Sequence, residues 1–517
     1  MTDESESWTP DILTRKKPFL PDWSYAGYRW GEEVFPGPMQ VIDMAGRVRS
    51  GDDATAALQD AIVEAGTLDG QTMIRFPPGT FEITNYIAIE CSGVTIAGSG
   101  SGPDGTVFRM PKPLDELPHP PEIRELEAEF SGADRSGSLF SWMGGYFWSR
   151  HPGGQEIRSM AREVTGRRGG HRILVPDGHG IKAGDVIQLQ WFNRGGNDSL
   201  LLRHIFHMKD IDFGKNLAAP EEPIVVQDAT VVVARRNRIE IKERLAHHMR
   251  PDLGAEIARR PMLSNIGLED FRIVFPDVPY AGHLKERGYN AIYLQDVRHG
   301  WVRNVTAVNA DNGFMTALSS QVTMEKITVE GRGGHHGISY SRGNGVLVKD
   351  FRVLNETIHP ITAGTQSHSC VYTNGWLAKP NLDQHRGVNH QNLFDSIHGD
   401  QTADTCVLFR HGGNAAWGPT AGAFNTMWNV ELTFADPTRH NAPIRMRRVK
   451  SAADARIIGL RANVPFGRLR YGPRCYIEGL NRAGIAVQSL YRFQLDRRLA
   501  GKGTGDDPDG PSAAPAG

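Results

Sequence analysis

The stretch VRNVTAVNADNGFMTALSSQVTMEKITVE, residues 302–330, contains one short pattern twice, 22 residues apart. The pattern is apolar-x-x-apolar-x-apolar, formed by Val302, Val305 and Ala307 and again by Met324, Ile327 and Val329. Asparagine, glycine and serine stand between the copies, and these residues favour turns. A strand-like unit that returns at a fixed interval is typical of a solenoid.

The same pattern recurs on both sides of this stretch. Clear copies begin at Leu268, Val348, Met427 and Ile457, and weaker copies begin at Val371 and Leu393. From 302 to 393 the steps are 22, 24, 23 and 22 residues, and longer steps elsewhere indicate inserted loops. The Leu/Asn signature of leucine-rich repeats is absent, and helical repeats would show a period of 3.6. The repeat therefore predicts a parallel β-helix.

Composition narrows the class of protein further. The chain has 517 residues, a formal net charge of −1, 39% hydrophobic residues and 58 glycines. Near-neutral charge argues against a nucleic-acid-binding protein, and no apolar run approaches the roughly 20 residues of a membrane span. The acidic N-terminus, MTDESESWTP, is not typical of a secretory signal. The compartment stays open: secreted or periplasmic if a signal was removed, otherwise cytoplasmic.

The four cysteines, which lie far apart and form no CxxC pair, are expected to be buried free thiols.

The open N-terminal end of such a solenoid requires a cover. In residues 50–66, one helical face is apolar: it carries Ala54, Ala57, Leu58, Ala61, Ile62 and Ala65. Ser50 or an aspartate after it can cap this helix, and Gly66 ends it. We therefore predict a capping helix before the first coils.

Five segments follow from these patterns. They are an N-terminal extension (1–40), a cap with the first coils (41–110), a β-rich insertion of antiparallel hairpins (111–262), the main coils (263–480) and a C-terminal segment with a disordered tail (481–517). The aromatic stretch FSWMGGYFWSRHPGG, residues 140–154, could stack on sugar rings or be buried in the core of the insertion.

The order DDATAALQDAI, IRFPPGTFEI and VTIAGSGSG, within residues 52–102, resembles the opening of the pectate-lyase-like superfamily of right-handed β-helix proteins. The resemblance covers roughly residues 40–110 and 262–480. It implies an all-β, right-handed parallel β-helix solenoid and, as in bacterial, fungal and phage members, chemistry on polysaccharides by lyases, glycoside hydrolases and a few transferases. It does not name the reaction.

Ionisable residues repeat with the coils. Asp311, His335, His359 and Asp383 are spaced by 24 residues each, so they are expected to form one column, about 4.8 Å per coil. His336, His385 and Arg386 would flank the column. The segment GHLKERGYN would bring further substrate-binding candidates to its N-terminal end, namely Lys285, Glu286, Arg287 and Tyr289.

Such a column suits β-elimination on a uronic-acid glycan, which requires a base near pH 7 and a cation beside the substrate carboxylate. We assign His335 or His336 as base, His359 or Tyr289 as proton donor and Arg386 as carboxylate partner. Lys285, Arg287 or a Ca²⁺ ion held by Asp311 or Asp383 could serve as the cation. The expected cofactor is thus none or Ca²⁺.

Five alternatives stay open. A glycoside hydrolase needs two nearby carboxylates, but the coils lack the adjacent Asp-Asp pair of polygalacturonase-like enzymes. A sugar transferase is also known on this fold. The column could instead hold Zn²⁺ or Mn²⁺, or its residues could simply satisfy turns. A non-enzymatic, tailspike-like glycan-binding module is the remaining class. The expected partner is a polysaccharide or oligosaccharide, with no nucleic acid or membrane, and a homotrimer or homodimer is expected.

Overall fold

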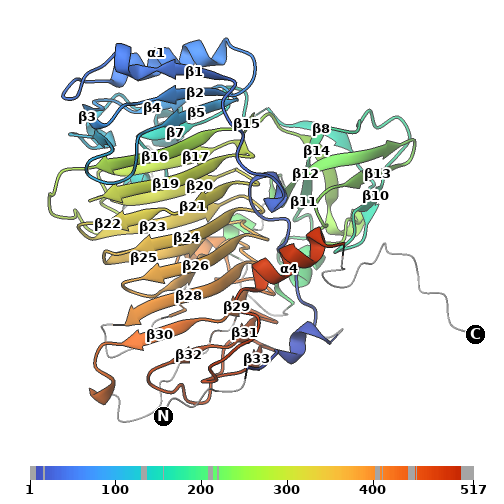
Figure 1. Cartoon of the computed structure of the whole chain (residues 1–517). Helices are drawn as coiled ribbons and strands as arrows, with labels where there is room; N and C mark the ends of the chain where they lie inside the picture. The colour runs from blue at the N-terminus through green and yellow to red at the C-terminus, as the bar shows by residue number, and fades with distance from the viewer. Residues whose placement is uncertain are drawn as a thin grey trace, which may run out of the picture.

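The computed structural model describes residues 7–15, 18–129, 137–154, 156–207, 214–217, 221–401, 408–409, 412–439, 449 and 451–501. Figure 1 shows a stack of coils with a cap at one end and a second sheet at one side. The predicted all-β architecture, a parallel β-helix with a capping helix and a β-rich insertion, is confirmed. The tail from 502 to 517, predicted to be disordered, lies outside the described residues.

Two long parallel sheets form the coils. The larger contains β1 (Gln40–Asp43), β2 (Thr72–Arg75), β3 (Gly79–Glu82), β5 (Val94–Ala97), β6 (Thr106–Arg109), β16 (Gly267–Val274), β19 (Trp301–Val308), β21 (Thr323–Glu325), β22 (Thr328–Glu330), β24 (Leu347–Val353), β26 (Val371–Leu377), β28 (Leu393–Gln401), β29 (Thr426–Trp428), β30 (Glu431–Phe434), β31 (Arg456–Ile458), β32 (Arg461–Ala462) and β33 (Tyr476–Glu478). The second contains β4 (Ile87–Ile89), β7 (Phe147–Ser149), β17 (Asn290–Gln295), β20 (Asn312–Ala317), β23 (Gly334–Ser341), β25 (Thr357–Ala363) and β27 (Leu382–Gln384).

A third side of the coil is narrow. It begins with the parallel pair β15 (Leu263–Ser264) and β18 (Val297–Arg298). It continues as single parallel bridges that join Arg298, Ser320, Asn344, His368 and His390 in turn. One residue per coil therefore marks this side.

The predicted apolar ladder holds for the clear copies of the repeat. Leu268 pairs with Val302, Val302 with Met324 and Met324 with Val348. The predicted starts of the weaker copies, Val371 and Leu393, are wrong by one residue. Val348 pairs with Tyr372, and Tyr372 pairs with Phe394.

The neighbouring row, which contains Leu347, Val371 and Leu393, is also buried, but in a separate apolar cluster on the outside of the coil. Because two adjacent rows are buried, the apolar pattern was assigned one residue too early at Val371 and Leu393.

The outer row is covered by an N-terminal segment, residues 7–15 and 18–35, which we call the strap, and by α4 (Leu490–Leu499). Trp23 of the strap donates its indole N–H to the Gln391 carbonyl at 2.7 Å, and Gly27 N–H donates to the Gly345 carbonyl at 2.8 Å. Trp8 forms a parallel bridge with Ile485 near the far end of the stack. The predicted N-terminal extension is thus packed along the coils.

The capping helix is α1 (Thr55–Gly66), which lies across the end of the stack (Figure 1). Its apolar face buries Leu58, Ala61, Ile62 and Ala65, as predicted. Ala54 is the residue before the helix, and the Asp53 carboxylate accepts from the Thr55 amide at 3.0 Å. An aspartate therefore does satisfy the first turn, from one position earlier than a standard N-cap.

The insertion forms a seven-stranded antiparallel sheet beside the coils (Figure 1). Its strands are, in order, β8 (Arg158–Ala161), β14 (Ala255–Arg259), β11 (Val186–Phe192), β12 (Pro223–Arg235), β13 (Arg238–Ile241), β10 (Arg172–Leu174) and β9 (Thr165–Gly166). The short helices α2 (Pro121–Glu129) and α3 (Leu200–Phe206) lie in the same part of the sequence. The sheet occupies only the later part of the predicted interval 111–262.

The aromatic stretch belongs to the coils, because β7 pairs with β4 and β17. Phe140, Tyr146, Phe147 and Trp148 are buried in the main core, whereas Trp142 is 47% exposed. Burial therefore accounts for most of these aromatic residues, in the β-helix core and not in the core of the insertion.

None of the helices that the structure describes combines the length and apolar character needed to cross a membrane. Cys370 is a buried free thiol, Cys91 and Cys475 are free and partly buried, and Cys406 lies outside the described residues.

Candidate histidine site

The second sheet places the histidine pair beside its neighbours. His336 on β23 pairs with His359 on β25 and with Asn312 on β20, and Thr362 pairs with Asp383 on β27. The column of strictly stacked residues predicted from the 24-residue spacing is therefore interrupted twice: His336, not His335, is in register with His359, and Asp383 is in register with Thr362, three residues after His359. His335 still joins the group, with its ring centroid 5.2 Å from that of His359.

Asp311 does not take part in the group. Its carboxylate accepts from the Arg332 guanidinium at 2.7 Å and from the backbone amides of Gly288 and Tyr289 at 3.1 and 3.0 Å. These donors hold the turn before β17, so the Asp311 carboxylate has a positioning role, although its backbone lies beside His335, whose amide donates to the Asp311 carbonyl at 2.7 Å.

Asp383 is the central carboxylate of the group and is fully buried. One of its oxygens lies 3.0 Å from Nδ1 of His359 and in hydrogen-bond contact with Nδ1 of His385. The other oxygen accepts from the Gly412 amide at 3.0 Å. Burial by itself would raise the pKa of Asp383, but the two imidazoles outweigh it and hold the pKa well below its usual range. Asp383 is therefore an anion that orients two rings.

His335 is held by a different set of acceptors. Its Nδ1 lies 2.9 Å from the Ser141 carbonyl and 3.4 Å from the Glu286 carboxylate. A carbonyl can only accept, so Nδ1 carries the proton and Nε2 keeps its lone pair. Burial, with His359 and His283 nearby, lowers the pKa of His335 to about 3, and this ring is neutral at pH 7.

His336 is neutral for the same reason. Its Nδ1 lies 3.1 Å from the Thr362 hydroxyl, and its ring stacks on His359 with centroids 4.8 Å apart. Burial and the neighbouring histidines place its pKa well below the usual value. A base with such a low pKa accepts a proton poorly near pH 7. Of the strand histidines, His359 has the nearer carboxylate on Nδ1, that of Asp383 at 3.0 Å, whereas Glu286 lies 3.4 Å from Nδ1 of His335.

Glu286, predicted to bind substrate, lies beneath His335 and is 1% exposed. Its carboxylate accepts from the Ser141 hydroxyl, the Tyr280 hydroxyl and the Leu284 amide. Burial and this hydrogen bond raise the pKa of Tyr280. Glu286 thus fixes the loop that precedes β17.

The remaining predicted site residues are three positively charged side chains and one tyrosine. Arg287 forms ion pairs with Asp115 and Glu116, and Lys285 is exposed. Arg386, in the turn after β27, donates to the Gly418 carbonyl. Tyr289 is buried in the main core with its ring 5.7 Å from that of Phe275, which sets it apart from the histidines.

Sequence reasoning missed two members of the group, His283 and Ser141, and it missed Arg332, which binds the Asp311 carboxylate. His283 stands in the segment that was expected near the column, and its ring centroid is 4.9 Å from that of His335. It lies outside the repeat, so the 24-residue spacing could not find it. A search for every histidine in that segment would have included it.

Two sets within the group could hold a metal ion. One is His283, His335 and His359, and the other is His359, Asp383 and His385; in each set one donor atom per residue lies within 4.8 Å of the others. Ca²⁺ prefers oxygen ligands, whereas both sets consist mainly of histidine nitrogens. The carboxylates of Asp311 and Asp383, which we predicted to bind Ca²⁺, already accept from N–H donors. The expectation of no cofactor or of Ca²⁺ stays a prediction.

Solvent reaches the group mainly from one side. His335, His336 and His359 are 3%, 6% and 3% exposed, whereas His283 is exposed and His385 is partly buried. The backbone at Gly412 closes over the rings: a Cβ there would lie 2.5 Å from His385 Cε1 and 3.1 Å from His359 Cε1.

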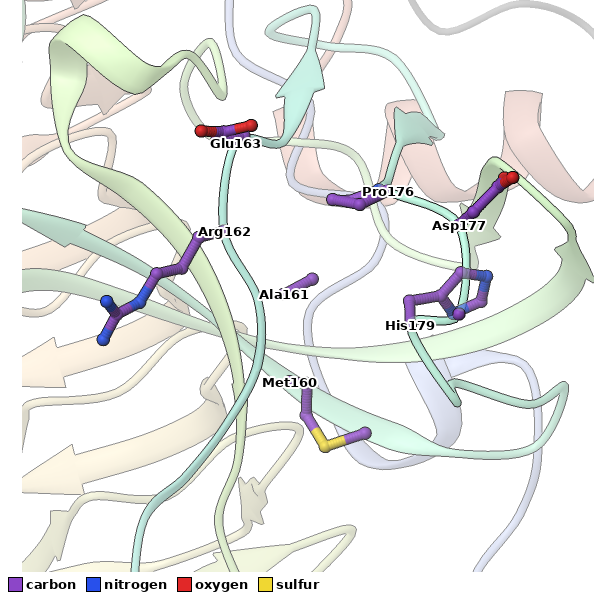
Figure 2. Close-up of a pocket in the computed structure, with 8 residues that line it drawn as sticks. Met160, Ala161, Arg162, Glu163, Pro176, Asp177 and His179 are labelled. Atoms are coloured by element: carbon purple, nitrogen blue, oxygen red, sulfur yellow. The ribbon is translucent and has the colours of Figure 1, made fainter.

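A surface pocket of about 330 Å³ lies elsewhere, on the insertion (Figure 2). It is lined by two segments, 160–163 and 176–179. Its only histidine, His179, uses Nε2 on the Arg235 carbonyl and Nδ1 on the Ile181 amide, so both ring nitrogens serve a turn.

Comparison with known proteins gives structural likeness only. No family model and no curated protein matches the chain. The solved structures that resemble it include the tailspike gp61 of Pseudomonas phage phi297, with 10% identity, a TM-score of 0.44 and coverage of 82% of this chain and 68% of that one.

The gp54 tailspike of Acinetobacter baumannii bacteriophage AP22, solved with a capsular saccharide, has 9% identity, a TM-score of 0.42 and coverage of 84% and 68%. DFA-IIIase from Arthrobacter chlorophenolicus, solved without its lid, has 12% identity, a TM-score of 0.39 and coverage of 86% and 94%. These likenesses are too distant to carry an argument about function.

Proposed function

We propose that this protein is a carbohydrate-active enzyme that cleaves an acidic polysaccharide, with β-elimination on a uronic-acid glycan as its reaction. The observation that carries the proposal is the buried Asp383 carboxylate, which contacts Nδ1 of both His359 and His385. A carboxylate on Nδ1 fixes the tautomer of a histidine and strengthens Nε2 as a proton acceptor. The sequence resemblance to polysaccharide-acting β-helix proteins supplies the substrate class.

The roles follow from which rings can gain a proton. Nε2 of His359 takes the proton from C5 of the uronate, and the electrons of the C–H bond form the C4–C5 double bond. The bond between C4 and the leaving oxygen breaks, and that oxygen receives a proton from the second imidazole on Asp383, that of His385. Arg386 lies next to His385 in sequence and is the proposed partner of the substrate carboxylate.

His335 and His336, first assigned as base, are better suited to shape the site, because the pKa of each is lowered by burial. Tyr289 is replaced as proton donor by His385, because its side chain belongs to the main core. These assignments are tested by substitution of each residue in turn.

The first experiment is a panel of acidic and neutral polysaccharides incubated with the protein, assayed for unsaturated uronate by ultraviolet absorbance and for new reducing ends. We expect both signals to rise together on at least one uronic-acid polymer and to be lost in His359→Asn. The matched control is His398→Asn, which replaces a histidine on β28 that is 41% exposed and contacts Glu431.

Two results would overturn the elimination mechanism. New reducing ends without unsaturated products would assign a glycoside hydrolase instead. Retained glycan binding without any turnover, equal in wild type and His359→Asn, would assign a binding module.

A further inference from the structure

The histidine group contains two imidazoles that the proposed reaction does not use, those of His283 and His335, and they converge on His359. His283, His335 and His359 each bring one ring nitrogen to within 4.8 Å of the other two. They come from three separate parts of the chain: the loop before β17, β23 and β25. Such convergence of three imidazoles is the donor set of open zinc sites, in which a fourth position is left for water or substrate.

The partners behind two of these rings are the kind that metal-binding histidines have. His335 directs Nδ1 to the Ser141 carbonyl at 2.9 Å, and His359 directs Nδ1 to Asp383 at 3.0 Å. These contacts fix each ring and leave Nε2 with the lone pair. Ligating histidines are held in this way by a carbonyl or a carboxylate on the other nitrogen.

The alternative set of His359, Asp383 and His385 is explained without a metal. Its short distances are those of hydrogen bonds between a carboxylate and two imidazole N–H groups. The three-histidine set includes no carboxylate that could account for its convergence in the same way.

We propose that His283, His335 and His359 bind one divalent transition-metal ion of the zinc type, through ring nitrogens, with a fourth coordination position directed to solvent. Three nitrogen donors favour Zn²⁺, Co²⁺ or Ni²⁺ over Ca²⁺ and Mg²⁺, which prefer oxygen. Ligand nitrogens around a tetrahedral Zn²⁺ are about 3.3 Å apart, given Zn–N distances of about 2.0 Å. The exposed His283 is the ligand that would move inward when the ion binds.

Metal binding and the proposed elimination would compete for Nε2 of His359, because a coordinated nitrogen has no lone pair left to accept the C5 proton. That part of the inference rests on the proposed function, whereas metal binding itself does not.

The test is metal binding by the full chain without any substrate. Protein freed of metal by a chelator is titrated with Co²⁺, which gives intense visible absorption bands in a tetrahedral site, and then with Zn²⁺, which displaces it. We expect one ion per chain in wild type, at least 10-fold weaker binding in His283→Ala and loss of the bands in His335→Asn and His359→Asn. Asp383→Asn, which replaces the carboxylate behind His359, should weaken binding by about 10- to 100-fold.

The control variant is His398→Ala, which should bind as wild type does. Because His283 is exposed, His283→Ala tests the site without disturbing the core. Unchanged Co²⁺ bands in His283→Ala and His359→Asn, or no stoichiometric binding by wild type, would overturn the proposal. Substrate turnover plays no part in these readings, so the outcome is separate from that of the polysaccharide panel.

Discussion

Two clusters of histidines in the described part of the molecule differ in what stands beside the rings. The site group on β23 and β25 has Asp383 and Glu286 within reach of its imidazoles. The second group lies between the insertion and the narrow side of the coil, and we call it the seam. Its members are His204, His247, His248, His368 and His390.

The seam is held by neutral hydrogen bonds. His390 donates Nδ1–H to the Val388 carbonyl at 2.6 Å, so its Nε2 accepts from His247 Nε2–H, also at 2.6 Å. His368 contacts the Val226 carbonyl on β12 at 2.8 Å. Among the described residues, no carboxylate is hydrogen-bonded to these five rings. The comparison teaches that burial alone makes histidine a structural residue, whereas a buried carboxylate on Nδ1 makes it a candidate for chemistry.

The largest expected effect is a difference in glycan turnover between a variant of the site group and a variant of the seam. His359→Asn should lower turnover of the glycan by about 10²- to 10⁴-fold, the usual contribution of a positioned acid or base. His390→Asn, which changes the seam, should leave turnover within a few-fold of wild type. The measurement is the initial rate of product formation at saturating substrate, with the folded state of both variants checked by circular dichroism. Equal losses of turnover in the two variants would mean that the site group and the seam do not differ in function.

The second prediction concerns stability against pH. Burial lowers the pKa of His204 to about 3, that of His368 to about 4 and those of His247 and His390 well below the usual value; Arg168 and Arg250 lower some of them further, and Asp228 opposes the shift at His368. A depressed pKa in the folded state means that the unfolded chain binds more protons below about pH 6.5. The free energy of unfolding should therefore be flat above pH 6.5 and fall on acidification, by about 2 kcal/mol per neutral histidine at pH 5.

Urea unfolding at pH 7.5 and pH 5 measures this loss. His390→Asn removes one such histidine and should reduce the dependence on pH by about one proton. The same dependence in wild type and variant would show that the seam does not exclude protons.

A third, smaller effect tests the buried carboxylate of the site. Glu286→Gln keeps the size of the side chain but turns an amide toward the donors of Ser141 and Tyr280, which should cost about 1–3 kcal/mol in the free energy of unfolding. Glu431→Gln, at a half-exposed pair with Arg461, should cost less than about 1 kcal/mol. Midpoints of urea unfolding at pH 7.5 compare the two.

The smallest effect is expected at His283. In the presence of a chelator, His283→Ala should change the free energy of unfolding by less than about 0.5 kcal/mol, because the side chain is exposed. A thermal unfolding curve checks this value. A large loss would mean that His283 holds its loop in place, and metal titrations of this variant would then need the more conservative His283→Asn.

The β-helix could be predicted from the sequence because its ladder places one apolar residue per coil at a constant position. The prediction slipped at Val371 and Leu393 because the strap creates a second buried row beside the ladder, and the sequence alone does not show which row faces inward. The capping helix was predicted correctly because its apolar face has the helical period over a short continuous stretch.

The site was only partly predictable, for a related reason. Repeat spacing brought His335, His336, His359 and Asp383 to one sheet, but the choice between adjacent histidines depends on strand register to a single residue. Asp311 lies beside His335 as the spacing predicts, but Arg332 and two turn amides bind its carboxylate oxygens, which the spacing could not show. His283 lies in a loop and Ser141 in a short 3-10 helix (Leu139–Ser141), and neither belongs to the repeat.

The strap gives the stack a property that coils alone lack. In a solenoid each repeat contacts only its neighbours, so its ends can fray separately. Here one continuous segment hydrogen-bonds in turn to Gly484, Gln391, Gly345 and Thr323, residues that belong to coils far apart. Separating any one coil from the stack breaks hydrogen bonds to the segment that also holds the other coils. We therefore expect the whole rod to melt in a single transition and, once residues 7–35 are deleted, in separate steps.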